Sequence, residues 1–263
     1  MDLGLRGKAA LVTGASRGLG RAVADALAAE GMDVAISART AADLERARAE
    51  IAAETGAHVV AIAGDLATDS GPAEVAGRAL ELLGRIDVLV TNGGGPPSGR
   101  FEAHDRAAWR SAMRGNFESA VELVRALLPA MKERGWGRII AITSIAAKQP
   151  VDGLILSNAS RAAVTGFART LANEVARHGV TVNCVLPGYT RTQRVETLAA
   201  ATAAERGCSP EDVVGGWAAQ IPAGRIGEPA EFAALVAFLA SERASYITGA
   251  SIPVDGGWIR ALL

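Results

Sequence analysis

Short apolar runs alternate with longer stretches in which apolar residues recur at helical spacing, along nearly the whole chain. Most of the short runs are continuous in Val, Ile, Leu and Ala, which is typical of strands covered on both faces in a parallel sheet. Alternation of such strands with helices indicates βαβ units. The strands predicted in this way span residues 8–13, 33–37, 58–62, 87–91, 138–143, 180–186 and 251–254.

Alanine-rich amphipathic segments lie between these strands. The predicted helices include residues 18–30, 41–55, 72–83, 107–134 and 158–178. Because crossovers between parallel strands are right-handed, they bring helices onto both faces of the sheet. The pattern therefore predicts the α/β class, with one Rossmann-like domain over residues 1–263 built on a doubly wound, seven-stranded parallel sheet.

Residues 188–228 form the one long stretch in which no strand is predicted. They are rich in Thr, Ala and Gly, and short helical patterns cover 193–205 and 210–219. A long excursion inside a compact domain is usually functional, so we expect a lid over a substrate site. The alternative is a surface decoration without a role in function.

Length, composition and charge narrow the classes of function. The 263 residues are 49% hydrophobic and 21% charged, with a formal net charge of −1. Nucleic-acid and membrane-surface binding need clustered positive charge, so neither is expected. No apolar run approaches the roughly 20 residues of a membrane span, and no signal peptide is expected. Cys184 and Cys208 form no metal or disulfide pattern, so we expect no metal site and a location in the reducing cytoplasm.

A glycine-rich segment follows the first predicted strand and opens the first predicted helix. It reads Thr13-Gly14-Ala15-Ser16-Arg17-Gly18-Leu19-Gly20. Glycines let the backbone approach a diphosphate, and the helix N-terminus offers unpaired N–H groups and a partial positive charge. A purely structural glycine turn is the alternative, but the strand–turn–helix context favours a dinucleotide site. Its predicted contacts are Gly14, Ser16, Arg17, Gly18, Leu19 and Gly20.

The end of the second predicted strand carries no acidic residue. It reads Ser37-Ala38-Arg39, whereas NAD-binding proteins place an Asp or Glu there to hold the ribose 2′-hydroxyl. A guanidinium clamps a phosphate through a bidentate fork, so Arg39, joined by Arg17, would pair with a 2′-phosphate. The sequence therefore predicts NADP(H) rather than NAD(H).

Further motifs occur where other predicted strands end. They are Gly64-Asp65-Leu66, Thr91-Asn92-Gly93-Gly94-Gly95, and Pro187-Gly188 with Thr190 and Thr192. Together with the glycine turn, they resemble the short-chain dehydrogenase/reductase family from about Leu5 to Trp258, and most of all its β-ketoacyl carrier-protein reductase-like branch. One departure is Thr91, where the family has the first Asn of an Asn-Asn-Ala-Gly segment. The resemblance implies cofactor contacts from Asp65, Leu66, Asn92, Gly93, Pro187, Gly188, Thr190 and Thr192.

The resemblance also implies an active site with a Ser, a Tyr about thirteen residues later and a Lys four residues beyond. Here the Ser is Ser144, and the same spacing leads to Ser157 and Arg161, so both the Tyr and the Lys are replaced. Asn116 stands where the family has its active-site Asn, in the predicted helix 107–134. The candidate catalytic residues are therefore Asn116, Ser144, Ser157 and Arg161.

These replacements change the chemistry that the site can perform. In the family the Tyr protonates the carbonyl oxygen as hydride arrives, and the Lys lowers the pKa of that Tyr and holds the ribose hydroxyls. An aliphatic hydroxyl such as that of Ser157 is far less acidic than a phenol, whose pKa is about 10. Arg161 keeps its proton but can still hold ribose hydroxyls and supply positive charge.

Three interpretations of the altered site remain open. Ser144, Ser157 and Arg161 could form a donor pocket for an oxyanion, with water supplying the proton later. Lys148 or Tyr189 could donate the proton instead. Alternatively, the substrate could arrive activated, as an iminium or a conjugated system.

The leading prediction is an NADP(H)-dependent oxidoreductase that reduces a carbonyl or related unsaturated small molecule. Two alternatives are a catalytically inactive NADP(H)-binding sensor or partner subunit, and a lyase or isomerase on the same scaffold. The resemblance also implies a homo-oligomer, a tetramer or dimer. Its candidate apolar contacts, each of which could equally be core, are Met131, Phe167, Leu171, Trp258 and Ile259.

Overall fold

Seven parallel strands form one sheet in the order β3-β2-β1-β4-β5-β6-β7 in the computed structural model, which describes residues 1–262. Each strand lies within two residues of its predicted bounds, and the predicted doubly wound α/β fold is confirmed. The strands are β1 (Ala9–Thr13), β2 (Asp33–Ala38), β3 (Val59–Ala63), β4 (Val88–Thr91), β5 (Gly137–Ile142), β6 (Val180–Pro187) and β7 (Ser251–Val254).

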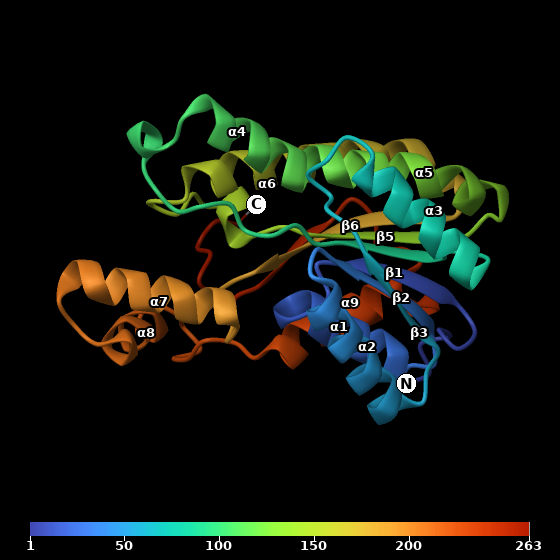
Figure 1. The fold of residues 1–263 in the computed structure, drawn as a ribbon, viewed down its shortest axis with the longest axis horizontal. Coiled ribbons are helices and arrows are strands. Elements are labelled where there is room, and N and C mark those ends of the chain that lie inside the picture. Colours follow the sequence, from blue (N-terminus) through green and yellow to red (C-terminus); the bar gives the residue numbers. More distant parts are fainter. Residues whose placement is uncertain (263) are drawn as a thin grey trace.

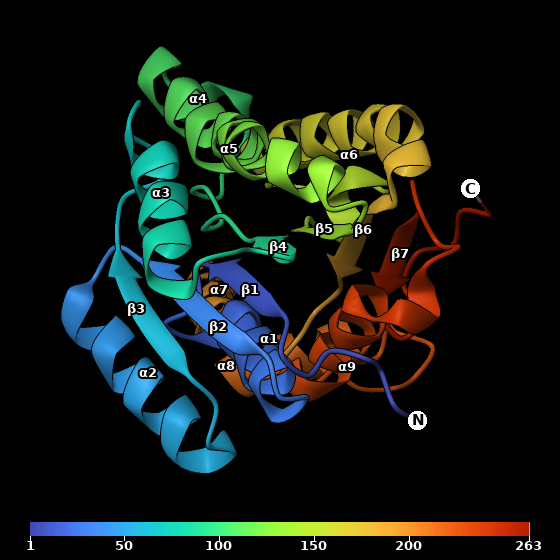
Figure 2. The same cartoon turned by 90° about the vertical axis from the view of Figure 1, so that its right-hand side faces the viewer.

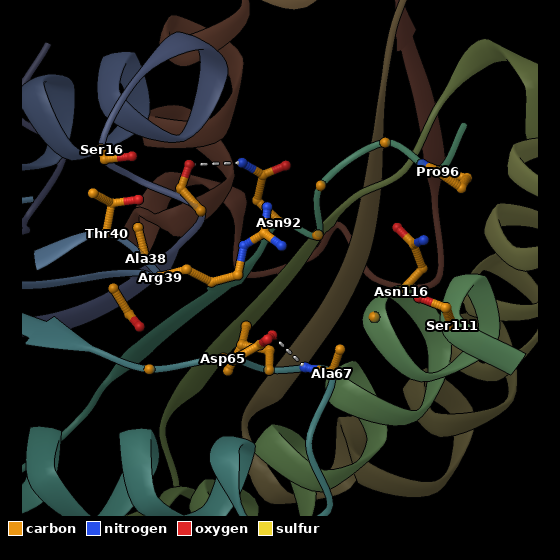
Figure 3. Close-up of a pocket in the computed structure, with 18 of the residues that line it drawn as sticks. Ser16, Ala38, Arg39, Thr40, Asp65, Ala67, Asn92, Pro96, Ser111 and Asn116 are labelled. Atoms are coloured by element: carbon orange, nitrogen blue, oxygen red, sulfur yellow. Dashed lines mark hydrogen bonds between the residues drawn. The ribbon is translucent and has the colours of Figure 1, made fainter. Parts of the chain in front are cut away.

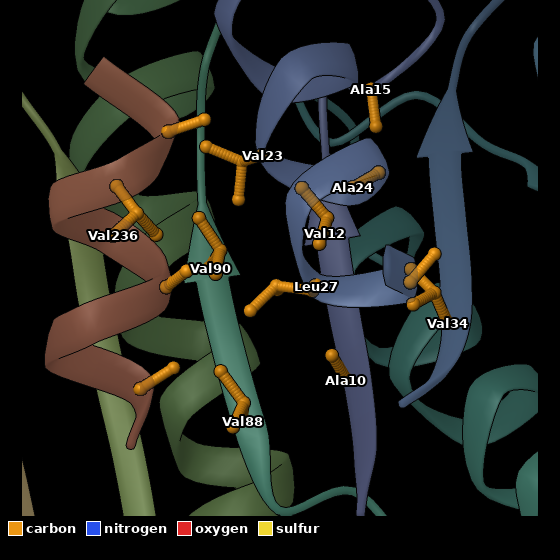
Figure 4. Packing of buried hydrophobic residues seen from close by; sticks show 14 of the residues in the cluster. Ala10, Val12, Ala15, Val23, Ala24, Leu27, Val34, Val88, Val90 and Val236 are labelled. Carbon is orange, nitrogen blue, oxygen red and sulfur yellow. The ribbon is translucent and has the colours of Figure 1, made fainter. Parts of the chain in front are cut away.

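Helices cover both faces of the sheet (Figures 1 and 2). On one face pack α1 (Gly18–Ala29), α2 (Ala41–Thr55) and α9 (Pro229–Ala240). On the other pack α3 (Gly71–Leu83), α5 (Ser119–Glu133) and α6 (Ile155–Val175). Figure 4 shows Val23 and Leu27 of α1 against Val12 and Val90 of the sheet, with Val236 of α9 beside them. Met131 and Leu171 are buried in the chain's own core on the second face.

Two predicted helices differ from the structure in an informative way. The predicted helix 107–134 is divided into α4 (Arg106–Met113), a π-helical turn at Arg114–Glu118, and α5. The predicted helix 158–178 begins earlier, as α6 at Ile155, and its last residues form a 3-10 turn at Ala176–His178. Ser157 therefore lies inside the first turn of α6.

Residues 188–228 carry α7 (Gln193–Arg206) and α8 (Pro210–Ala218), close to the two short helices expected there. They follow the carboxyl end of β6 and project beside the sheet (Figure 1). The pair has a small core of its own, formed by Ala199, Ala203, Val213 and Trp217. The Tyr189 ring stacks on Trp217, with centroids 4.7 Å apart, which ties the start of the segment to α8.

Residues 1–262 lack two kinds of feature. None of their helices is both long and apolar enough to cross a bilayer. They also contain no group of three His, Cys, Asp or Glu side chains placed to hold a metal ion.

Candidate active site

The cleft lies at the carboxyl ends of β1 and β4, where the strand order reverses, which is where open α/β sheets bind ligands. Asn92, which follows β4, joins the two strands: its N–H donates to Thr13 Oγ1 at 2.8 Å, and its Nδ2 donates to Gly14 O at 3.2 Å. Two cavities of about 390 and 420 Å³ open here. Both are lined by Gly14, Arg17, Arg39, Asn92, Gly93, Gly94 and Gly95.

The glycine turn is held close to the next loop of the cleft. Gly14 has a φ of +59°, a left-handed conformation that strains other residues, and a Cβ there would lie 2.6 Å from Asn92 O. The Ala15 N–H donates to Ser37 O at 3.0 Å, which fixes the turn to β2. Arg17 is the N-cap of α1, and because its side chain cannot accept hydrogen bonds, the N–H groups of the first turn are left for an anionic ligand.

We predict that Gly14→Ala raises the Kd for NADPH at least about 10-fold and lowers the free energy of unfolding by about 1–3 kcal/mol. Calorimetric titration and urea unfolding would measure the two effects. The matched control is Gly77→Ala on the exposed face of α3, where a Cβ would meet no atom of residues 1–262 within 4 Å. The control should bind NADPH with the wild-type Kd. An unchanged Kd in Gly14→Ala would contradict the prediction that the glycine turn binds the diphosphate of the cofactor.

The first cavity carries the residues predicted for the adenosine half of the cofactor. Figure 3 shows Ser16, Thr40 and Arg39 on one side, with Asn116 and Ser111 on the other. Asp65 Oδ1 accepts from the Ala67 N–H at 3.0 Å, which orients the carboxylate at the edge of the cavity. Leu66 lines the same cavity.

The second cavity holds three of the four candidate catalytic residues, Ser144, Ser157 and Arg161. Ser144 caps a 3-10 turn, where its Oγ accepts from the Ala146 N–H at 3.1 Å and therefore keeps its own O–H to donate. Ser157 is half-buried on α6, one turn before Arg161. The two hydroxyls and the guanidinium thus line one chamber.

Arg161 is anchored by backbone carbonyls of two strand ends. Its Nη1 donates to Ile142 O at 2.6 Å and its Nη2 to Gly93 O at 2.9 Å. Only 7% of the residue is exposed, and its Nε has no hydrogen-bond partner within residues 1–262. Burial, and secondly the charge of Arg194, lower the pKa of Arg161 to about 10, so the side chain stays cationic at neutral pH.

Asn116 lies in the π-helical turn between α4 and α5 and lines the first cavity. Its Nδ2 donates to Ala112 O at 3.0 Å, while its buried Oδ1 has no hydrogen-bond partner in the described residues. A Cβ on Gly93 would lie 2.8 Å from that Oδ1, so the turn packs directly against the loop that holds Arg161. Asn116 therefore supports the Gly93 loop, whose carbonyl oxygen binds the Arg161 guanidinium.

The two alternative proton donors are placed differently. Tyr189 lines the second cavity, and burial raises the pKa of its hydroxyl. Lys148, at the end of the 3-10 turn after Ser144, is not among the residues that line either cavity. Of the two donors expected from the sequence, the structure brings only Tyr189 to the chamber.

The cleft collects nearly all of the predicted cofactor residues. Leu19, Pro187, Gly188, Thr190 and Thr192 line the second cavity beside the catalytic candidates. Gly20 lines neither cavity; it is buried beneath the turn, where a Cβ would collide with the backbone of Gly14. The sequence analysis missed Arg194 on the first turn of α7, which lines the second cavity; its only sequence signal is its place two residues after Thr192.

The sequence model for short chain dehydrogenases matches residues 8–203, well over half of the chain. The chain belongs to the short-chain dehydrogenase/reductase family. The predicted family is thereby confirmed.

Members of the short-chain dehydrogenase/reductase family resemble this chain over its full length. The 3-oxoacyl-(acyl-carrier-protein) reductase FabG of Escherichia coli (strain K12) is 35% identical over 255 residues, which cover 97% of this chain and 98% of the relative. L-Sorbose reductase from Gluconobacter frateurii, solved with NADPH and L-sorbose, has a TM-score of 0.95 at 33% identity, with 100% of both chains covered. A variant of actinorhodin polyketide ketoreductase, solved with NADPH, has a TM-score of 0.92 at 31% identity, covering 97% of this chain and 98% of that one.

Proposed function

We propose that this short-chain dehydrogenase/reductase uses NADPH to reduce the carbonyl group, or a related unsaturated group, of a small molecule, without a Tyr/Lys pair. The observation that carries this proposal is the buried cation Arg161 in one chamber with the hydroxyls of Ser144 and Ser157. Such a chamber stabilises negative charge that develops on an oxygen, which is the main electrostatic demand of carbonyl reduction.

The cofactor is NADP(H), as the sequence predicted. The residues present fit it: a glycine turn that a Cβ would fill lies at one end, and Arg17 and Arg39 line both cavities beside it. We assign the diphosphate to the turn and the N-terminus of α1, and the 2′-phosphate to Arg39 with Arg17. Asp65, Leu66, Asn92 and Gly93 would hold the adenosine half, and Pro187, Gly188, Thr190 and Thr192 the nicotinamide half. NADPH, when bound, supplies the hydride.

In the proposed mechanism the protein stabilises an oxyanion before any proton is transferred. The free O–H of Ser144 donates to the substrate oxygen, and Ser157 lines the carbonyl pocket. Arg161 has two Nη hydrogens and the Nε–H left after its bonds to Ile142 O and Gly93 O, so it can also hold a ribose hydroxyl. Its charge stabilises the alkoxide, which a water molecule protonates as the product leaves.

The segment 188–228 is proposed to act as the substrate lid. Its first residues, Tyr189 to Leu198, supply much of one wall of the second cavity. Closing such a wall excludes bulk water, and a fixed positive charge acts more strongly on an oxyanion in a drier site. The small core of Ala199, Ala203, Val213 and Trp217 keeps α7 and α8 together as one unit, and the stacking of Tyr189 on Trp217 ties the start of the segment to α8.

The pH dependence of the rate, measured together with the variant Tyr189→Phe, distinguishes this mechanism from proton donation by a titrating side chain. The pKa of Arg161 is lowered only to about 10, so the cation persists below that pH, and we predict a flat profile of kcat/KM from pH 6 to 9. Stopped-flow oxidation of NADPH would measure it. Because burial raises the pKa of Tyr189, proton donation by its hydroxyl would leave the profile equally flat, so a rate that falls about 10²-fold or more in Tyr189→Phe would show instead that Tyr189 is the acid.

Loss of NADPH absorbance with a panel of aldehydes, ketones, imines and enones tests the proposed function. The expected result is turnover with at least one class, which Arg161→Met reduces. NADPH that binds but is never oxidised would favour a sensor or a non-catalytic subunit. A cofactor that is required but never consumed would favour a lyase or isomerase.

A further inference from the structure

Two arginine side chains reach the same short stretch of backbone in the second cavity. Arg161 Nη2 donates to Gly93 O at 2.9 Å, and Arg194 Nη2 donates to Pro96 O at 2.8 Å. The two guanidinium groups are therefore held at opposite ends of the run from Gly93 to Pro96. One comes from the fixed helix α6 and the other from the first turn of α7, in the segment proposed as the lid.

Neither cation has a counter-charge. Within the part of the chain that the structure describes, no carboxylate lies within 4.0 Å of Arg161 or Arg194, although thirteen ion pairs form elsewhere. The described residues that line the second cavity include four arginines and no Asp or Glu. Arg161 is also nine-tenths buried and has an unpartnered Nε. A buried cation without a counter-charge is costly, and an anion bound beside it would offset that cost.

The backbone between the two arginines carries no side chain at Gly94 and Gly95. A Cβ on Gly95 would lie 3.1 Å from Arg194 Nε, and one on Gly94 would meet no atom of residues 1–262 within 4 Å. At Gly94 a ligand can therefore approach the main chain directly, while the Arg194 side chain packs on Gly95. The positive charge of Arg194 also contributes, after burial, to the lowered pKa of Arg161.

The phosphates of the cofactor are assigned to the glycine turn, Arg17 and Arg39, which line the second cavity as well. With the phosphates assigned to those groups, Arg161 and Arg194 are left with uncompensated positive charge, because no carboxylate of the described residues pairs with either. A negative group on the substrate would instead balance it. Arginine is well suited to this task because its fork matches a carboxylate with two parallel hydrogen bonds.

We propose that Arg194 and Arg161 form an anion site for the substrate, so that this enzyme reduces oxo acids, carbonyl compounds that carry a carboxylate. The inference rests on the proposed function. In the reaction, NADPH gives a hydride to the carbonyl carbon, the C=O π bond becomes an alkoxide, and water protonates it to a hydroxy acid, leaving NADP⁺ and hydroxide. The intermediate carries two negative charges, and the site offers two cations.

Matched substrate pairs test the proposal. Kinetics would be measured with 2-oxobutanoate, acetoacetate and 4-oxopentanoate, each against its methyl ester, for the wild type and for Arg194→Met. The wild type should prefer at least one acid over its ester. Loss of charge-assisted hydrogen bonds should lower kcat/KM for that acid about 10- to 100-fold through KM, with little change for the ester. Arg191→Met is the control, because Arg191 precedes α7, pairs with Glu228 at 3.0 Å and lies outside both cavities.

Two outcomes would overturn the anion site while leaving the proposed function intact. One is an equal preference for acid and ester that Arg194→Met does not change. The other is an equal loss for both substrates together with a similar rise in the Kd for NADPH. That second result would assign Arg194 to the diphosphate of the cofactor.

A separate readout decides the case in which no pair is turned over and the proposed function fails. Protein saturated with NADP⁺ would be titrated calorimetrically with the same three acids and esters. Binding of an acid, but not its ester, that is lost in Arg194→Met and kept in Arg191→Met would still support the anion site. No binding to the wild type, or equal binding to Arg194→Met, would overturn it.

Discussion

Arg161→Met is expected to lower the rate of hydride transfer at saturating NADPH by about 10²- to 10³-fold, the usual cost of removing one preorganised oxyanion donor. Methionine keeps an unbranched stem but removes the charge and the contacts to Gly93 O and Ile142 O. Single-turnover stopped-flow measurement separates this step from binding and product release. The Kd for NADPH should rise less than the rate falls, because the turn and Arg39 remain.

The control for this experiment must separate catalysis from folding, since Arg161 also joins two strand ends. Arg169→Met changes the same residue type two turns along α6, at an exposed position outside both cavities, and should retain the full rate. Arg161→Lys retains a charge and is expected to recover part of the rate. If folded Arg161→Met protein reduces substrate at the wild-type rate, Arg161 has no part in the chemistry.

Arg39→Asp is expected to reduce the preference for NADPH over NADH by about 10²- to 10³-fold. A guanidinium–phosphate pair contributes roughly 1.5–3 kcal/mol, which is lost, and the new carboxylate repels the 2′-phosphate. The same carboxylate can accept a hydrogen bond from the 2′-hydroxyl of NADH, as acids at this position do in NAD-binding proteins. The ratio of the two dissociation constants, measured by calorimetry, reports the change directly.

Arg78→Asp on α3 is the matched control, because it makes the same change in net charge at an exposed site outside both cavities. It should leave the ratio within about twofold of the wild type, given the screening of exposed charges that lie more than about 10 Å apart. If the ratio of the two dissociation constants is unchanged in Arg39→Asp, Arg39 does not bind the 2′-phosphate.

Local patterns account for the part of the fold and site that the sequence predicts well. Continuous apolar runs identify the seven strands because both faces of this sheet are covered. The glycine turn and Arg39 follow directly from the ends of β1 and β2, so their place in the cleft requires only the strand order. The motif spacing likewise brings Ser144, Ser157 and Arg161 to one cavity.

Tertiary contacts account for what the sequence does not predict. The π-helical turn at Asn116 does not interrupt the helical spacing of apolar residues in the sequence of 107–134. The pattern therefore predicts a single helix over this segment. The helix α9 is almost entirely apolar and lacks the polar face by which the other helices are recognised. The partners of Arg161 are carbonyls at residues 93 and 142, and Arg194 reaches Pro96 across the cleft; both contacts exist only in the assembled fold.

Transfer of deuterium from NADPH labelled at C4 of the nicotinamide is the most direct test of carbonyl reduction without the Tyr/Lys pair. Each of the two labelled epimers would be incubated with the panel of carbonyl compounds, oxo acids included, and the products analysed by mass spectrometry. We expect deuterium at the carbinol carbon from one epimer only, with the yield reduced in Arg161→Met. NADPH that binds tightly but leaves no deuterium in any product would contradict carbonyl reduction by this protein.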